Sequence, residues 1–369
     1  MPKENSEFRI WAWGDCHVGT DIKHVYESLV TAITHSEADA NEENNNNPFE
    51  WDIALDVGDC SGGQSVPEDE EGHELVRQFN TLKKHNREDI YNVCGNHDRS
   101  GLDEPEAWWW RKYVDPTGEH TEHSGLDSSR RPYPVSGTWE RYSFRVGNLL
   151  FLMLSDINEP SQTIGRGDLG GNPGGVVRRE TFEWWREMVE ANPDSIIITA
   201  HHYMLKETTV ASGEWEGMVK KEDGSWTGGY HGYKPQGSPR GASYLYWVGG
   251  VEDAQCFENY LAEHPGAIAM WLGGHTHAHP DAQDGNKSHI EIKWGVHFIN
   301  TAALTRYHIN PQFPNPPKSR LIEFADGSDE ITVRCYIHTD EFLPKGWYDS
   351  AERTLKLNQP FEYRSQGNS

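Results

Sequence analysis

The sequence predicts an α/β fold in which two mixed sheets pack as a sandwich between helices. Five short apolar runs, each bounded by Gly, Asp or Asn, are typical of buried parallel strands. They are Phe8–Trp13, Ile53–Val57, Ile90–Val93, Ile196–Thr199 and Ile268–Leu272. Helical patterns lie between the first three runs, which is the strand–helix–strand alternation of an α/β sheet.

The helices are predicted from apolar residues spaced three and four apart, which share one face of a helix. Two such stripes separate the first three strands: Tyr26, Leu29, Val30 and Ile33, then Leu75, Val76, Phe79 and Leu82. Two further helices are expected over 180–190 and 253–264, each leading into the next strand.

Antiparallel pairing is predicted in two places. The runs 141–146 and 148–155 form a hairpin that turns at Gly147-Asn148. Strands are also expected over 296–301, 320–324 and 331–339, and a turn that contains Asp326-Gly327 joins the last two. The fold should therefore contain parallel and antiparallel portions.

The composition excludes several functional classes. With 369 residues the chain can bury a large core, and its net charge of −25 disfavours a nucleic-acid surface, which is normally basic. No apolar run approaches the ~20 residues of a membrane span. The N-terminus lacks an apolar signal segment, so a cytoplasmic location is expected, although a trimmed exported form stays open. The oligomeric state is not predicted.

Five polar clusters, each just after an apolar run, hold most of the capacity of the chain to bind a metal. They are Asp15-Cys16-His17, Gly58-Asp59-Cys60, Gly95-Asn96-His97-Asp98, Ala200-His201-His202 and Gly274-His275-Thr276-His277. Aspartate, asparagine and histidine supply oxygen and nitrogen donors that Zn²⁺, Mn²⁺ and Fe²⁺ accept. Strand ends are also where an open α/β sheet builds its sites.

In this order, the clusters resemble the signature of the calcineurin-like metallophosphoesterase superfamily. That signature is D-x-H, then G-D, then G-N-H-[DE], then a single or doubled His, then G-H-x-H, and all five parts are present over about three quarters of the chain. The resemblance implies a four-layer α/β/β/α sandwich, with two mixed β-sheets flanked by helices. It also implies two divalent metal ions, with Mn, Fe and Zn left open, that bind a phosphoryl oxygen and activate a water.

The resemblance further implies the role of each residue. The seven expected metal ligands are Asp15, His17, Asp59, Asn96, His201, His275 and His277, with Asp59 as the bridge. His201 is preferred because the first histidine of such a pair usually ligates, and His202 is the alternative. His97 would act as general acid, and Asp98 would orient its imidazole. Gly62 stands where purple acid phosphatases carry a tyrosine, so an Fe³⁺–tyrosinate centre is not expected.

The expected function is metal-dependent hydrolysis of a small organic phosphate ester. A phosphodiesterase is favoured over a phosphomonoesterase because the long aromatic segment 206–248 suggests a sizeable second substituent. A non-catalytic binding scaffold is the alternative from a different class. Substrate contacts are expected from Arg99, His202, Tyr203, His231 and Arg240.

The whole catalytic domain is expected over 1–340, followed by a C-terminal arm over 341–369. Insertions are expected near 41–48, 158–176 and 206–248. The five cysteines are an odd number without a C-x-x-C pair, which disfavours a disulfide framework. Cys16, Cys60 and Cys94 are interpreted as small buried apolar groups, with metal ligation or redox control as alternatives.

Overall fold

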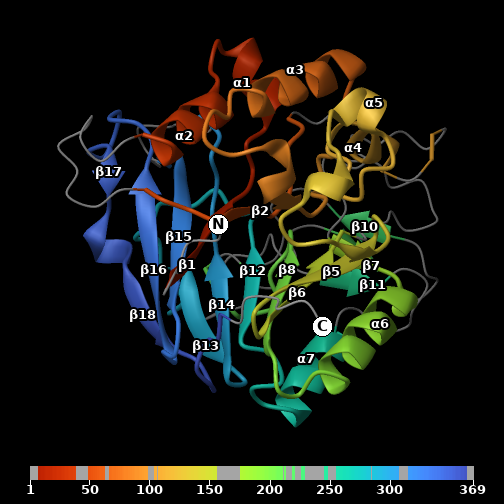
Figure 1. Ribbon diagram of the computed structural model, residues 1–369, viewed down its shortest axis with the longest axis vertical. Helices are drawn as coiled ribbons and strands as arrows, with labels where there is room; N and C mark the ends of the chain where they lie inside the picture. The colour runs from red at the N-terminus through yellow and green to blue at the C-terminus, as the bar shows by residue number, and fades with distance from the viewer. Residues whose placement is uncertain are drawn as a thin grey trace.

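Two seven-stranded sheets pack face to face in the computed structural model, with helices on their outer faces (Figure 1). The structure describes residues 7–38, 49–62, 66–98, 104–105, 107–155, 175–210, 212, 218–220, 226–228, 245–247, 255–283, 285–306 and 315–363.

The first sheet has the strand order β17-β16-β15-β1-β2-β3, with β18 also paired to β16. Its strands are β1 (Glu7–Trp13), β2 (Ile53–Asp56), β3 (Ile90–Asn92), β15 (Lys318–Ala325), β16 (Glu330–Ile337), β17 (Gly346–Trp347) and β18 (Arg353–Lys356). β1, β2 and β3 run parallel, whereas β15 is antiparallel to β1. The last part of the chain therefore widens this sheet through β17 and β18.

The second sheet has the order β13-β14-β12-β8-β6-β5-β4. Its strands are β4 (Ser136–Gly137), β5 (Arg141–Val146), β6 (Leu149–Leu154), β8 (Ile196–His201), β12 (Met270–Gly273), β13 (Ile290–Lys293) and β14 (Val296–Asn300). β6, β8, β12 and β14 are parallel, and β5, β13 and β4 pair antiparallel at the two edges. Two small pairs complete the described strands: β9 (Met218–Lys220) with β10 (Trp226–Gly228), and β7 (Gly175–Val177) with β11 (Leu245–Trp247).

The helices are distributed over both outer faces of the sandwich. They are α1 (Val18–Lys23), α2 (Ser28–Ser36), α3 (Asp69–Phe79), α4 (Trp108–Tyr113), α5 (Thr121–Ser124), α6 (Arg179–Glu190) and α7 (Gln255–Glu263), with 3₁₀ turns η1 (Arg87–Asp89), η2 (Ser128–Arg130) and η3 (Asp349–Ala351). Side chains of α2, α3 and α4 pack with Trp11 and Trp13 of β1 on the first sheet. Side chains of α6 and α7 pack with Trp271 of β12 on the second sheet.

Alternation along the strands divides the apolar side chains between the core inside the sandwich and the two outer layers. Ile10 and Ala12 of β1 point into the core between the sheets, while Trp11 and Trp13 point to the helices outside. On β8, Ile198 faces the same inner core. A strand buried on both faces reads as a continuous apolar run, which is why these segments were recognisable in the sequence.

The predicted fold class is confirmed, because the two mixed sheets lie between layers of helices. The predicted hairpin is β5–β6, and Gly147 in its turn has φ +56°, a conformation that glycine adopts without strain. The predicted insertions 41–48, 158–176 and 206–248 fall largely outside the described residues. The boundary between residues 340 and 341 stays a prediction. Among the described residues, no helix is long and apolar enough to cross a membrane.

Candidate metal centre

The five polar clusters meet at one end of the sandwich, where β1, β2, β3, β8 and β12 finish. Asp15 and His17 follow β1, and Asp59 follows β2. The backbone turns sharply at these points, because Asp15, His17, Asp59 and His275 have φ of 54°, 43°, 61° and 66°. Non-glycine residues rarely adopt this left-handed conformation, which marks these four turns as sharply bent.

Glycine is needed beside the central aspartate. A Cβ on Gly95 would lie 2.1 Å from both the backbone nitrogen and Oδ1 of Asp59, and one on Gly58, which has φ +99°, would lie 2.6 Å from the nitrogen of Gly95. The second and third clusters therefore touch through their glycines. This close approach brings the end of β3 against the end of β2.

One group of donor atoms consists of Asp15, His17 and His277. His277 Nε2 lies 3.0 Å from Asp15 Oδ1 and 3.1 Å from His17 Nε2. Asp15 Oδ2 accepts a hydrogen bond from the backbone nitrogen of His275 at 2.9 Å. The first and fifth clusters are thus joined, although they lie on different sheets.

Asp59 sits between two further groups, one with His17 and His97 and one with His202 and His275. Asp59 Oδ2 lies 3.1 Å from His202 Nε2, 3.9 Å from His17 Nε2 and 4.0 Å from His97 Nε2. Its carboxylate therefore lies between the two groups, and the bridging role expected for it stays a prediction. Asn96 joins the second group, since its Oδ1 lies 3.0 Å from His202 Nε2.

Backbone carbonyls define which nitrogen of two imidazoles faces the cluster. His17 Nδ1 is 2.7 Å from the carbonyl oxygen of Ser61, and His202 Nδ1 is 2.7 Å from that of Val57. A carbonyl only accepts, so each Nδ1 carries the proton, and in a neutral ring Nε2 presents a lone pair. The Nε2 atoms then face carboxylate and amide oxygens, where either a proton on Nε2 or a bound cation would be stabilised.

The titration behaviour agrees with a site built for cations. Burial raises the pKa of the Asp15 carboxyl to about 7. Burial lowers the pKa of His202, but the Asp59 and Asp15 carboxylates outweigh it and raise that pKa to about 9. Burial lowers the pKa of His277 to about 3, so this imidazole is neutral and able to donate a lone pair. A buried carboxylate beside a buried imidazole therefore holds a proton where no metal is bound.

Of the two adjacent histidines, His202 faces the donor atoms of the cluster and His201 faces away from them. His201 Nδ1 accepts a hydrogen bond from the backbone nitrogen of Tyr203 at 2.9 Å, and its ring lies 6.3 Å from that of Trp271. Among the described residues, its buried Nε2 has no hydrogen-bond partner, and the three donor groups include His202 but not His201. These contacts favour the alternative, His202, and the assignment of either histidine as a metal ligand stays a prediction. The cause of the difference is strand alternation, which turns His201 to the outer face of β8 and His202 to the inner one.

His97 is a mostly buried member of the cluster. It is 8% exposed, its backbone nitrogen donates to Asp59 Oδ1 at 2.7 Å, and its ring lies 4.8 Å from that of His17. Asp98 is fully buried, and its carboxylate accepts hydrogen bonds from the backbone nitrogens of Asp59, Ser61 and Gly95 at 2.7–2.9 Å. Those bonds make Asp98 an anchor of the metal-binding turns, a role that the sequence analysis did not assign. The orientation of His97 by Asp98 stays a prediction.

The expected substrate contacts are only partly described. Arg99, His231 and Arg240 lie outside the described residues. Tyr203 is buried at 1% exposure, with its ring 4.5 Å from that of His275, so it packs behind the cluster. His275 and His277 are half-buried, whereas His97 is buried, so the first two are the more accessible of these three histidines. The two backbone carbonyls behind His17 and His202 could not be found from residue types, because every residue has one.

The three cysteines beside the clusters are buried free thiols. Cys60 Sγ donates to Asp56 Oδ2 at 3.0 Å, and Cys16 Sγ lies 3.8 Å from the carbonyl oxygen of Cys60. Burial raises the pKa of Cys16 to about 11, so the reactive thiolate is disfavoured. These contacts fit the interpretation as small packing groups.

Comparison with known proteins found no protein-family model and no curated sequence that matches the chain. Solved structures that match include Vacuolar Protein Sorting 29 from Cryptosporidium parvum, at 13% identity over 95% of this chain and 98% of that chain, with a TM-score of 0.33. They also include a single mutant of Vps29 from Entamoeba histolytica, at 13% identity over 95% and 100%, with a TM-score of 0.33. Vps29 from Chaetomium thermophilum matches at 10% identity over 96% and 100%, with a TM-score of 0.32.

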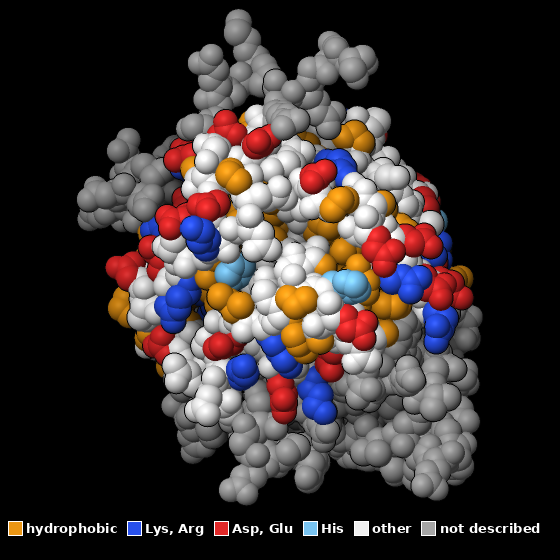
Figure 2. All heavy atoms as spheres, turned by 90° about the horizontal axis from the view of Figure 1, so that it is seen from below, with side chains coloured by type: hydrophobic (Ala, Val, Ile, Leu, Met, Phe, Trp, Pro, Cys, Tyr) orange, Lys and Arg blue, Asp and Glu red, His pale blue; other side chains and the backbone are white. Residues whose placement is uncertain are grey.

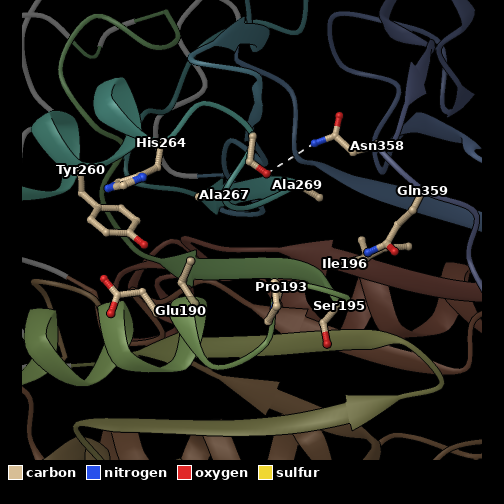
Figure 3. Close-up of a pocket in the computed structure, with 12 residues that line it drawn as sticks. Glu190, Pro193, Ser195, Ile196, Tyr260, His264, Ala267, Ala269, Asn358 and Gln359 are labelled. Atoms are coloured by element: carbon tan, nitrogen blue, oxygen red, sulfur yellow. Dashed lines mark hydrogen bonds between the residues drawn. The ribbon is translucent and has the colours of Figure 1, made fainter.

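A separate cavity of about 400 Å³ lies at the opposite end of the second sheet, where β8 begins (Figure 3). Glu190 and Tyr260 face each other across it, and Gln359 lies on its far wall. None of the predicted site residues lines this cavity. On the described part of the face seen in Figure 2, acidic and basic side chains are interspersed and neither gathers into a large patch.

Proposed function

We propose that the chain is a dinuclear-metal-dependent phosphoric ester hydrolase that acts on a small organic phosphate. The observation that carries the proposal is the arrangement around Asp59. Its buried carboxylate lies among four side chains from both sheets, and the backbone carbonyls at Nδ1 turn the Nε2 atoms of His202 and His17 toward it. Oxygen and imidazole donors in this number suit Zn, Mn or Fe.

The residues present fit a pair of metal ions. Asp15, His17 and His277 would hold one, and Asn96, His202 and His275 would hold the other, with Asp59 shared between them. Two such ions supply positive charge that stabilises both the attacking and the leaving oxygen of a phosphoryl transfer. The carbonyls of Ser61 and Val57 keep the two imidazoles in the tautomer that ligation needs.

The role proposed for His97 is to donate a proton to the leaving oxygen. It is supported by its place next to Asp59, since His97 Nε2 lies 4.0 Å from Asp59 Oδ2, and by the 8% of the residue that stays exposed. Its backbone nitrogen is held by Asp59 Oδ1, so the position of the residue is coupled to the bridging carboxylate. A group that donates to the leaving oxygen should affect the rate more than the metal content.

The proposed partner is a small phosphoester rather than nucleic acid. The net charge of −25 supports this, because a nucleic-acid surface needs many unpaired basic side chains. Within this class we favour a diester, because the long aromatic segment 206–248 suggests a second substituent.

The test combines elemental analysis with a substrate panel. The full chain, reconstituted with Mn²⁺, Zn²⁺ or Fe²⁺, should bind about two ions per chain and hydrolyse bis-p-nitrophenyl phosphate faster than p-nitrophenyl phosphate. His264→Ala, in the cavity far from the cluster, serves as a control and should leave both values unchanged. Fewer than one ion per chain, together with no turnover on either ester, would refute the proposal. Turnover on the monoester alone would refute only the preference for a diester.

A further inference from the structure

Two positively charged side chains are buried together beside the metal centre. Lys318 and Arg320 are 0% and 1% exposed, and they are the first and third residues of β15. Residues two apart on a strand point to the same side. Ile322 and Phe324 continue that side and pack in the core between the sheets, so Lys318 and Arg320 also point into the space between the sheets.

No carboxylate pairs with either side chain among the residues that the structure describes. Lys318 Nζ donates to the neutral oxygens of Asn315 Oδ1 at 2.6 Å and of the Pro316 carbonyl at 3.1 Å. Arg320 Nη1 donates to the Ala351 carbonyl at 3.4 Å, which is a long hydrogen bond. Arg320 Nε and Nη2 are buried and have no hydrogen-bond partner within the described part of the chain. Buried charges are normally paired, because isolating them from water is costly.

The surroundings do not supply the missing negative charge. His289 is buried, and its Nε2 lies 2.7 Å from the carbonyl oxygen of His279, so Nε2 carries the proton. Burial, with the charges of Arg320 and Lys318, lowers the pKa of His289 well below its usual value, so this imidazole is neutral. Asp15 is the carboxylate whose charge reaches Lys318, and it belongs to the metal centre. Burial lowers the pKa of Lys318 to about 7.

The region is closed from outside by contacts between two segments. Tyr348 and Ser350 donate hydrogen bonds to Asp281, which ties the segment leading to η3 to the loop that follows His277. Ala351, at the end of η3, packs with Cys335, the partner of Arg320 in the register of β15 and β16. The site is therefore covered, and any ligand must be small.

We propose that Lys318 and Arg320 form a binding site for a small inorganic anion, separate from the metal centre. The unpartnered Nε and Nη2 of Arg320 form the fork with which guanidinium binds a halide or two oxygens of an oxyanion. Lys318 adds a second positive charge from the same side of the strand. Chloride and inorganic phosphate are the two candidate ligands, and the closed surroundings favour chloride because it is the smaller ion.

The first test measures thermal unfolding of the full metal-loaded chain in sodium chloride and in sodium gluconate at equal ionic strength. An anion that binds only the folded chain should raise the unfolding temperature by about 2–5 °C between 1 and 300 mM chloride. Arg320→Met should abolish this rise, and Arg353→Met, at an exposed position on β18, should keep it. An equal chloride effect in the wild type and in Arg320→Met would overturn the proposal.

Two further arms separate the sources. Asp59→Asn, which alters the metal centre, should keep the chloride effect, whereas its loss there would place the anion at the metals and overturn the proposal. In a parallel series, inorganic phosphate replaces chloride. If only phosphate stabilises the wild type and Arg320→Met removes that effect, the site is supported and its ligand is an oxyanion. If Arg320→Met does not fold, diffraction from bromide-soaked wild-type crystals decides. An anomalous peak beside Arg320 Nη2 is expected, and its absence would refute a halide.

Discussion

Replacing His202 and His201 one at a time tests the geometry of the candidate metal centre. We expect His202→Asn to weaken metal binding and His201→Asn to leave it almost unchanged. Asparagine keeps a polar group near the position of Nδ1 but has nothing at the position of Nε2. The Val57 carbonyl behind residue 202 and the Tyr203 nitrogen behind residue 201 could therefore still be satisfied, and only the function of Nε2 is removed.

The expected magnitude follows from the contacts of each Nε2. The Nε2 atom of His202 lies 3.1 Å from Asp59 Oδ2 and 3.0 Å from Asn96 Oδ1. The Nε2 atom of His201 has no hydrogen-bond partner among the described residues. Loss of a residue that only supports a ligand costs about 10–100-fold in metal affinity, so loss of a ligand should cost at least ~100-fold. This corresponds to about 3 kcal/mol. For His201→Asn we expect a change in metal affinity below about threefold and a loss of about 1–3 kcal/mol in folding stability, because the ring leaves a cavity beside Trp271.

The assay is a titration of each metal-free variant against a chelator of known affinity, with elemental analysis of the refilled protein. Circular dichroism shows whether each variant is folded. The reasoning is refuted if His201→Asn loses the metal and His202→Asn retains it. Equal losses in both would show that the second cation depends on the whole turn rather than on one nitrogen.

Three other substitutions test separate parts of the structure. His97→Ala should lower turnover by about 10²–10⁴-fold while metal content stays near two ions per chain, and loss of metal would show that His97 is a ligand. Gly95→Ala should lower the metal content and should lower folding stability by about 2–4 kcal/mol, because the new Cβ would lie 2.1 Å from Asp59. Unchanged metal content and stability would show that the turn can shift freely. Lys318→Met should raise stability near pH 7 in chloride-free buffer, by at most about 5 kcal/mol. Burial sets the pKa of Lys318 near 7 in the folded chain against 10.5 in the unfolded chain, so the unfolded chain holds the extra proton between these values. The free energy of unfolding of the wild type should therefore rise from pH 7 to pH 10, and denaturant titrations should show a smaller rise for Lys318→Met. An equal rise in both proteins would refute the lowered pKa of Lys318.

The sequence was sufficient for the elements that carry a strong local pattern. The buried strands were predicted because runs such as 196–199 are apolar on both faces, and the donors were predicted because strand ends of one sheet meet at one edge. The choice between His201 and His202 required knowledge of which face of β8 looks toward the other sheet. Alternation places His202 with Ile198 and Ala200, but either face was equally apolar in the sequence.

Long-range contacts could not be predicted in the same way. Nothing in the residues around Asp98 indicates that its carboxylate holds three backbone nitrogens of neighbouring turns. Lys318 and Arg320 are long charged residues, a type that is normally exposed, yet both are buried. Their burial depends on η3 and on the loop after His277, which are distant in the chain.

The origin of the donor residues has a consequence for folding. Asp15, His17, Asp59 and Asn96 follow strands of the first sheet, whereas His202, His275 and His277 follow strands of the second. Bound metal ions would therefore cross-link the two halves of the sandwich at one end, much as a disulfide joins two segments. Removal of the ions should then weaken the packing between the sheets at that end. On removal, hydrogen exchange should speed up more for amides near the ends of β1 and β12 than for amides at the opposite ends of the same strands.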